Sequence, residues 1–184
     1  MRLEVYLNAR GERRLVGLLE ERGGDILFEY DKRFLDSGIE LSPFLLPLRP
    51  GVASDPKRTF DGLFGVFNDS LPDGWGLLLL DRLLRRSGLP LERITPLSRL
   101  SLVGSGGMGA LEYEPVTPDP DPLPERIDLD GVAEEAWRTL NEDPLPVETL
   151  RTLMALNGSS CGARPKIMVR VSGDRRLIVP DAVA

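Results

Sequence analysis

One stretch near the end of the sequence combines residue types that can bind phosphate. Residues 157–166 read Asn-Gly-Ser-Ser-Cys-Gly-Ala-Arg-Pro-Lys. Small side chains leave successive backbone N–H groups uncovered, and such groups form a concave anion site. Lys166 adds a positive charge beside them. We therefore expect a loop that covers phosphate, and the alternative is a surface turn that happens to be rich in glycine and serine.

The spacing in this loop differs from the Walker pattern, because Gly162 is followed by Ala-Arg-Pro-Lys and not by Lys-Ser/Thr. Pro165 disfavours a helix directly before it, and residues 167–171 alternate apolar and polar side chains, which predicts a strand. A glycine-rich loop that leads into a strand is typical of protein kinases. The residues expected to bind nucleotide are Gly158, Ser159, Ser160, Cys161, Gly162, Ala163 and Lys166.

Composition excludes several other classes of function. The 184-residue chain has a formal charge of −6, which opposes direct binding to DNA. Histidine is absent and Cys161 is the only cysteine, so Ser–His–Asp and Cys–His catalysis, ordinary zinc sites and intrachain disulfides are excluded. No signal peptide and no apolar run of membrane-spanning length is visible. We therefore expect a cytoplasmic protein without membrane contact and without a bound metal.

Alternating apolar residues predict three strands near the N-terminus, over residues 3–7, 15–19 and 26–30. Short turns separate them, which indicates an antiparallel meander. Residues 41–48 are apolar but contain two prolines, so we expect an edge strand or an extended segment. A further strand is expected over residues 110–114.

Helical spacing predicts helices at 61–67, 72–87, 93–103 and 147–156, and another that begins at Asp128 or Asp130. Asp69 and Asp73 could form a carboxylate pair for metal or acid–base chemistry, but capping and turn formation is the simpler role. The run Gly-Ser-Gly-Gly-Met-Gly over residues 104–109 matches a dinucleotide fingerprint only in its letters. It follows a helix and precedes a strand, which is the reverse of the required order.

These patterns predict an α+β fold: an N-terminal antiparallel meander packed with helices, then a helical segment and a hairpin that follows the glycine-rich loop. The hairpin pairs residues 167–171 with 176–179. We expect an N-terminal subdomain over 1–115, a linker rich in proline and aspartate over 116–127, and a second region over 128–184.

Three motifs resemble the HipA family of bacterial serine/threonine kinases, the toxins of HipA–HipB toxin–antitoxin systems. Residues 62–76, with Asn-Asp-Ser-Leu-Pro-Asp-Gly at their centre, resemble the family's N-terminal signature. Residues 104–110 resemble the turn that enters the next strand, and residues 157–169 are similar to the family's glycine-rich loop. The resemblance implies an N-terminal α/β subdomain followed by the first hairpin of a kinase-like N-lobe.

The same resemblance implies a parent enzyme that transfers the γ-phosphoryl group of ATP to a protein serine with the help of Mg²⁺. The family's catalytic and metal-binding residues would lie beyond Ala184, so we expect no catalytic residue in this chain, no activity of the chain alone and no tight binding of ATP or Mg²⁺. Ser159 aligns with the serine that HipA-like kinases autophosphorylate.

The expected partners are a HipB-like helix-turn-helix antitoxin, which would meet residues 1–115, and the protein substrate of the parent kinase. DNA contact would come through the antitoxin. The alternative is a stand-alone binding module that resembles the N-terminal subdomain and restrains a separate HipA-like kinase.

Overall fold

The structure, a computed structural model, describes residues 1–86, 88, 94–107, 109–115, 128–141, 145–157, 162, 164–171 and 178–180. The chain forms two compact units. The first contains Met1–Leu71 and Thr95–Pro118, and the second contains Pro72–Ile94 and Asp119–Ala184. Residues 72–94 lie within the range expected for the N-terminal subdomain, and by their contacts they group with the second unit. The reason is packing, because the helix that they form contacts a helix close to the C-terminus.

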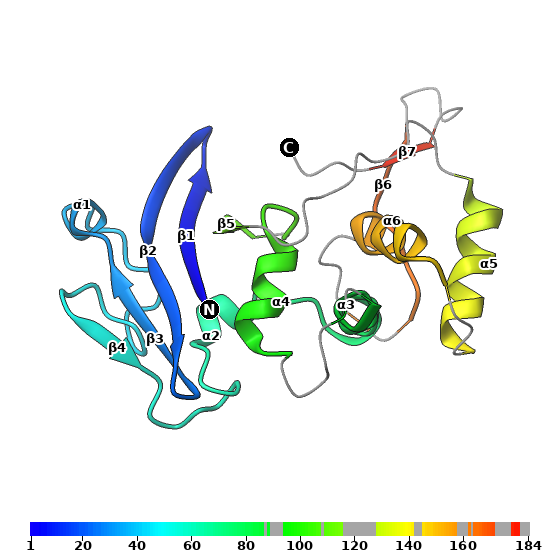
Figure 1. The fold of residues 1–184 in the computed structure, drawn as a ribbon. Coiled ribbons are helices and arrows are strands. Elements are labelled where there is room, and N and C mark those ends of the chain that lie inside the picture. The colour runs from blue at the N-terminus through cyan, green and yellow to red at the C-terminus, as the bar shows by residue number, and fades with distance from the viewer. Residues whose placement is uncertain are drawn as a thin grey trace. The chain divides into compact units, whose positions relative to one another are not determined.

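An antiparallel sheet of five strands forms the first unit, in the order β4-β3-β2-β1-β5 (Figure 1). The strands are β1 (Arg2–Ala9), β2 (Glu12–Arg22), β3 (Asp25–Tyr30), β4 (Val52–Ser54) and β5 (Leu111–Glu114). Gly23 and Gly24 turn β2 into β3 with φ angles of 61° and 87°, as a tight hairpin requires. The predicted meander and the predicted strand near residue 111 are therefore confirmed.

The segment from residue 41 to residue 48 is not the predicted edge strand. It forms a turn closed by a bridge between Ser42 and Leu46, and Tyr30 Oη donates a hydrogen bond to the Leu46 carbonyl at 2.9 Å. Leu46 is buried, while the side chain of Phe44 at the tip is 94% exposed. The edge strand is instead β4, which pairs with β3.

Three helices complete the first unit: α1 (Lys32–Leu35), α2 (Gly65–Asn68) and α4 (Pro96–Val103). Thr95 caps α4 through a reciprocal pair of hydrogen bonds with Ser98, and Pro96 occupies its first turn. The helix packs against β1 and β5. Gly104 is the C-cap residue of α4, so the run that begins at Gly104 ends the helix, as predicted.

The core of this unit lies between the sheet and the helices. Its central side chains are the buried residues Leu3, Val5, Val16, Leu19, Phe28, Phe64, Phe67, Leu97, Leu100 and Tyr113. Tyr113 Oη and Ser70 Oγ are 2.7 Å apart inside this core. Burial raises the pKa of the Tyr113 phenol above its ordinary value, and the hydrogen bond between this phenol and Ser70 partly opposes the rise. The Ser-Leu-Pro motif is thus tied to β5 by a buried polar contact.

The second unit is mainly helical. It contains α3 (Gly74–Arg86), α5 (Leu129–Leu140), α6 (Val147–Asn157) and the antiparallel pair β6 (Val169–Val171) and β7 (Ile178–Pro180). Helix α3 packs against α6, and α5 contacts α6 (Figure 1). The pairing of β6 with β7 confirms the predicted hairpin. Within the described residues, no helix combines the length and apolarity that crossing a membrane requires.

Candidate functional site

The backbone of Gly162 makes two hydrogen bonds with the start of helix α3. Its N–H donates a hydrogen bond to Oδ1 of Asp73 at 2.6 Å, and its carbonyl accepts one from the N–H of Trp75 at 3.0 Å. Asp73 directly precedes α3, and Trp75 lies in the first turn. The first N–H groups of a helix have no partner inside the helix. The Gly162 carbonyl therefore accepts a hydrogen bond from one of these N–H groups, although Gly162 lies far from α3 in the sequence.

The two ends of the glycine-rich stretch also meet. The N–H of Met168 donates a hydrogen bond to the carbonyl of Leu156 at 2.6 Å. Leu156 is buried in the last turn of α6, and Met168 directly precedes β6. The stretch is thus a loop with a closed base, and Gly162 is a second fixed point within it.

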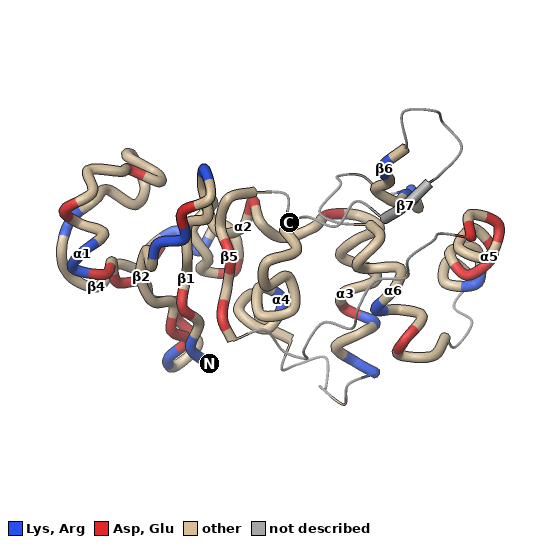
Figure 2. Tube along the Cα trace, turned by 90° about the horizontal axis from the view of Figure 1, so that it is seen from above, with Lys and Arg blue, Asp and Glu red and all other residues tan. Residues whose placement is uncertain are grey.

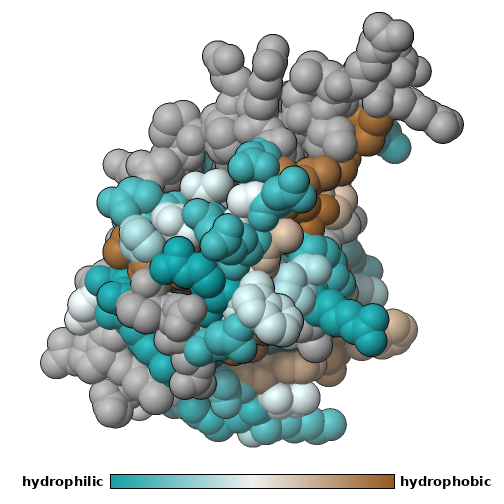
Figure 3. Space-filling model, turned by 90° about the vertical axis from the view of Figure 1, so that its right-hand side faces the viewer, coloured by the Kyte–Doolittle hydropathy of each residue, from teal (hydrophilic) through white to brown (hydrophobic). Residues whose placement is uncertain are grey.

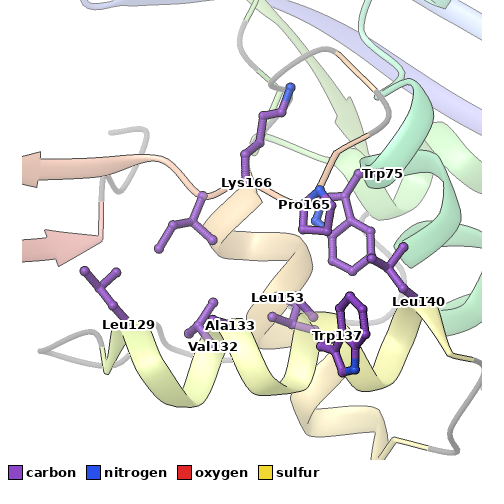
Figure 4. Close-up of a pocket in the computed structure, with 11 residues that line it drawn as sticks. Trp75, Leu129, Val132, Ala133, Trp137, Leu140, Leu153, Pro165 and Lys166 are labelled. Atoms are coloured by element: carbon purple, nitrogen blue, oxygen red, sulfur yellow. The ribbon is translucent and has the colours of Figure 1, made fainter.

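The side chain of Lys166 lies over Gly162. An added Cβ at Gly162 would lie 2.6 Å from Lys166 Nζ, and φ at Gly162 is +115°. The positive φ favours glycine here, because a side chain would strain the backbone, whereas the flexible lysine side chain could move aside. The Lys166 side chain extends away from the apolar side chains of α5 (Figure 4). The positive charge is thus placed at the loop, where an anion would bind.

An apolar pocket of about 270 Å³ lies beside the base of the loop. It is lined by Trp75, Leu129, Val132, Ala133, Ala136, Trp137, Leu140, Leu153, Pro165, Lys166 and Ile167. Helix α5 supplies most of these side chains, and Trp75 of α3 approaches from the opposite side (Figure 4). The Trp137 side chain is 66% exposed although it is large and aromatic.

The coloured surface in Figure 3 is mostly hydrophilic and holds smaller groups of hydrophobic residues.

Of the residues predicted to bind nucleotide, the structure places Gly162 and Lys166 side by side. Gly158, Ser159, Ser160, Cys161 and Ala163 lie outside the described residues, and so does the whole of the predicted linker over residues 116–127. The predicted phosphorylation of Ser159 therefore stays a prediction.

Asp69 and Asp73 do not act as one pair. Asp69 is the C-cap residue of α2, whereas the Asp73 carboxylate accepts the hydrogen bond from Gly162. In the part of the chain that the structure describes, no group of three or more histidine, cysteine, aspartate or glutamate side chains could hold a metal ion. Asp73 thus serves the glycine loop, a role that we did not predict.

Two further residues of this site were missed. Trp75 was expected only on the apolar face of its helix, and its backbone N–H also binds the loop. Gly76 lies close to the loop's first residue, because an added Cβ would be 2.6 Å from both Asn157 Nδ2 and Pro72 Cβ. In the sequence, a glycine within a predicted helix was the signal that another segment packs closely against the helix at this position.

The chain was compared with models of protein families. Residues 3–114 match the family model described as the HipA N-terminal domain. A comparison with curated proteins found no significant match.

Proposed function

The chain belongs to the HipA N-terminal domain family, and from this premise we propose that it is the N-terminal part of a HipA-like serine/threonine protein kinase. In this proposal the loop around Gly162 covers the phosphates of ATP. Mg²⁺ and the catalytic carboxylates belong to other parts of the kinase. The parent enzyme transfers the γ-phosphoryl group of ATP to a serine of another protein.

The observation that carries this proposal is the position of Lys166 over Gly162. A glycine-rich turn with a closed base offers backbone donors, and an ammonium group beside it adds the charge that a phosphate needs. The turn leads into strand β6 and not into a helix. This order supports a kinase-type loop over a P-loop of the NTPase type.

Lys166→Ala tests the proposal in the complete kinase. A charged hydrogen bond to phosphate contributes about 1.5–3 kcal/mol, so ATP should bind about 10- to 100-fold more weakly. The measurement is ATP affinity by calorimetry together with transfer of labelled phosphate to serine. Lys57→Ala is the matched control, because Lys57 is exposed in the first unit and is one of only three lysines. The isolated 184-residue chain should incorporate no phosphate. Equal ATP affinity of the two variants would contradict the proposal.

A HipB-like helix-turn-helix protein is the proposed partner of the first unit. Lys and Arg are dispersed along the described trace and interleaved with Asp and Glu (Figure 2). Arg13, for example, forms ion pairs with Glu112 at 2.7 Å and with Glu114 at 2.6 Å. Basic side chains that are already paired release few counterions from DNA. We therefore expect the partner to make the DNA contacts.

This expectation has a direct test. In a gel-shift assay at physiological salt, the chain alone should leave duplex DNA unshifted, and a mixture with the partner should give a larger complex than the partner alone. A shift by the chain alone would contradict the proposed division of roles. The stand-alone module that restrains a separate kinase is the second candidate, because the family match covers residues 3–114 and not the glycine loop. In that case Lys166→Ala would leave kinase activity unchanged.

A further inference from the structure

Asp73 and Trp75 exchange hydrogen bonds with Gly162 in opposite directions. The helix end accepts from the loop through the Asp73 carboxylate and donates to the loop through the Trp75 N–H. We propose that this reciprocal clamp makes Asp73 a positioning residue, which fixes the glycine loop to the start of helix α3. The proposal deepens the proposed function and rests on it where it concerns ATP.

The clamp resembles a capping box whose two members lie 89 residues apart. An aspartate at a helix start ordinarily accepts from an N–H of its own first turn. Here the Trp75 N–H is satisfied by the Gly162 carbonyl. The Asp73 carboxylate is therefore available to the loop, and each segment satisfies a backbone group of the other.

The consequence for the loop is a division of roles. The Gly162 N–H is engaged by a carboxylate at 2.6 Å, so it anchors the loop and does not donate to phosphate. In the proposed function, the ammonium group of Lys166 is the described group that would meet the phosphate. The ammonium group of Lys166 lies close to Gly162, so a displacement of Gly162 would change the distance between this charge and the loop. Without the hydrogen bond to Asp73, the loop would no longer hold Gly162 at a fixed position relative to the ammonium group of Lys166.

The hydrogen bond at Asp73 is exposed to water. Water and salt weaken the electrostatic part of such a contact. The bond from Trp75 is formed between backbone groups and does not depend on the side chain at residue 73. We therefore expect Asp73→Ala to loosen the loop locally and to leave the packing of α3 on α6 intact.

Amide hydrogen exchange of the 184-residue chain, followed by NMR, tests the clamp without any nucleotide. Asp73→Ala should accelerate exchange of the Gly162 amide about tenfold, since it removes a charged acceptor. Asp73→Asn should restore part of the protection, because the amide oxygen still accepts a hydrogen bond. The Met168 amide, bonded to Leu156 at the base of the loop, should keep its wild-type rate in both variants. This internal control separates loss of the clamp from a general loss of stability.

Asp69→Ala is the matched variant, because it removes a carboxylate of the same motif that is not the acceptor of the Gly162 N–H. It should leave the Gly162 amide unchanged. The proposal is overturned if Gly162 exchanges at the rate of an unprotected amide in the wild type, or if Asp73→Ala and Asp69→Ala give the same rate.

A second measurement separates the clamp from the proposed function. In the complete kinase, Asp73→Ala should weaken ATP binding, and Asp73→Asn should weaken it less. If the Gly162 amide responds to Asp73 while neither Asp73→Ala nor Lys166→Ala changes ATP affinity, the clamp stands and the ATP-binding function fails. If the amide does not respond, the clamp fails whatever the result with ATP.

Discussion

Gly17→Ala should cost the first unit about 3 kcal/mol or more of folding free energy. Gly17 lies in β2, the central strand of the sheet, and pairs with Val5 on one side and Tyr30 on the other. A Cβ at this position would lie 2.2 Å from the backbone oxygen of Glu29 and 2.8 Å from Cζ of Phe28. A backbone atom in a paired strand has no room to move, so β3 would have to separate from β2. A single domain has only about 5–15 kcal/mol of stability in total.

Gly109→Ala is the control for this prediction. Gly109 also lies in the first unit, its φ is not positive, and an added Cβ would come no closer than 4.0 Å to another atom. This variant should change stability by no more than about 0.5 kcal/mol. The readout is hydrogen exchange of peptides from β2 and β3, because both tryptophans lie in the second unit and their fluorescence reports on that unit. Unchanged protection of these strands in Gly17→Ala would contradict the prediction.

The regular elements of the fold follow from local patterns, which is why they could be predicted. Alternation located β1, β2, β3 and β5, and the spacing of leucines located α3 and α6. The exceptions depend on contacts that no local pattern contains. Residues 41–48 are apolar enough for a strand, but the buried hydroxyl of Tyr30 binds the Leu46 carbonyl and holds a turn. Strand β4 has three residues, of which only Ala53 is partly buried, so it shows no alternation.

The division of the chain into two packed units also depends on contacts that no local pattern contains. The motif around Asn68-Asp69-Ser70-Leu71-Pro72-Asp73 reads as one continuous unit, yet the chain passes from the first unit to the second between Leu71 and Pro72. Ser70 joins Tyr113 in the first core, and Asp73 joins Gly162 in the second unit. Each half of the motif has a partner far away in the sequence. A composition shift cannot reveal such a boundary.

For the candidate site, the sequence predicted the loop and the lysine but not the residues that hold them. Gly162 and Lys166 were identifiable because glycine-rich turns beside a lysine have an evident use. Asp73 was not, because an aspartate before a helix is expected to cap that helix. The structure instead directs its carboxylate to another segment. Helix α3 therefore does more than fill the core, since its first turn is where the loop is fixed.

Gly76→Ala should connect packing to this site. Gly76 lies on the side of α3 that faces α6, and an added Cβ would lie 2.6 Å from Asn157 Nδ2 and 2.6 Å from Pro72 Cβ. Asn157 is fully buried and is both the last residue of α6 and the first of the glycine-rich stretch. The new methyl group would therefore push the start of the loop away from the helix that anchors its centre. Overpacking costs about 1–3 kcal/mol, against which alanine recovers about 1 kcal/mol of helix propensity.

Gly131→Ala, in helix α5, should not lower the stability of the second unit. Its added Cβ would meet the carboxylate of Asp128 at 2.7 Å, and that side chain makes no capping hydrogen bond, so it can move aside. This variant should be neutral or up to about 1 kcal/mol more stable than the wild type. Denaturant unfolding followed by tryptophan fluorescence compares the two, because Trp75 adjoins Gly76 and Trp137 lies on the same helix as Gly131. In Gly76→Ala the Gly162 amide should also exchange faster, since the loop's first residue has moved relative to Asp73. Equal midpoints for the two alanine variants would show that α3 and α6 do not need the glycine contact to set the loop.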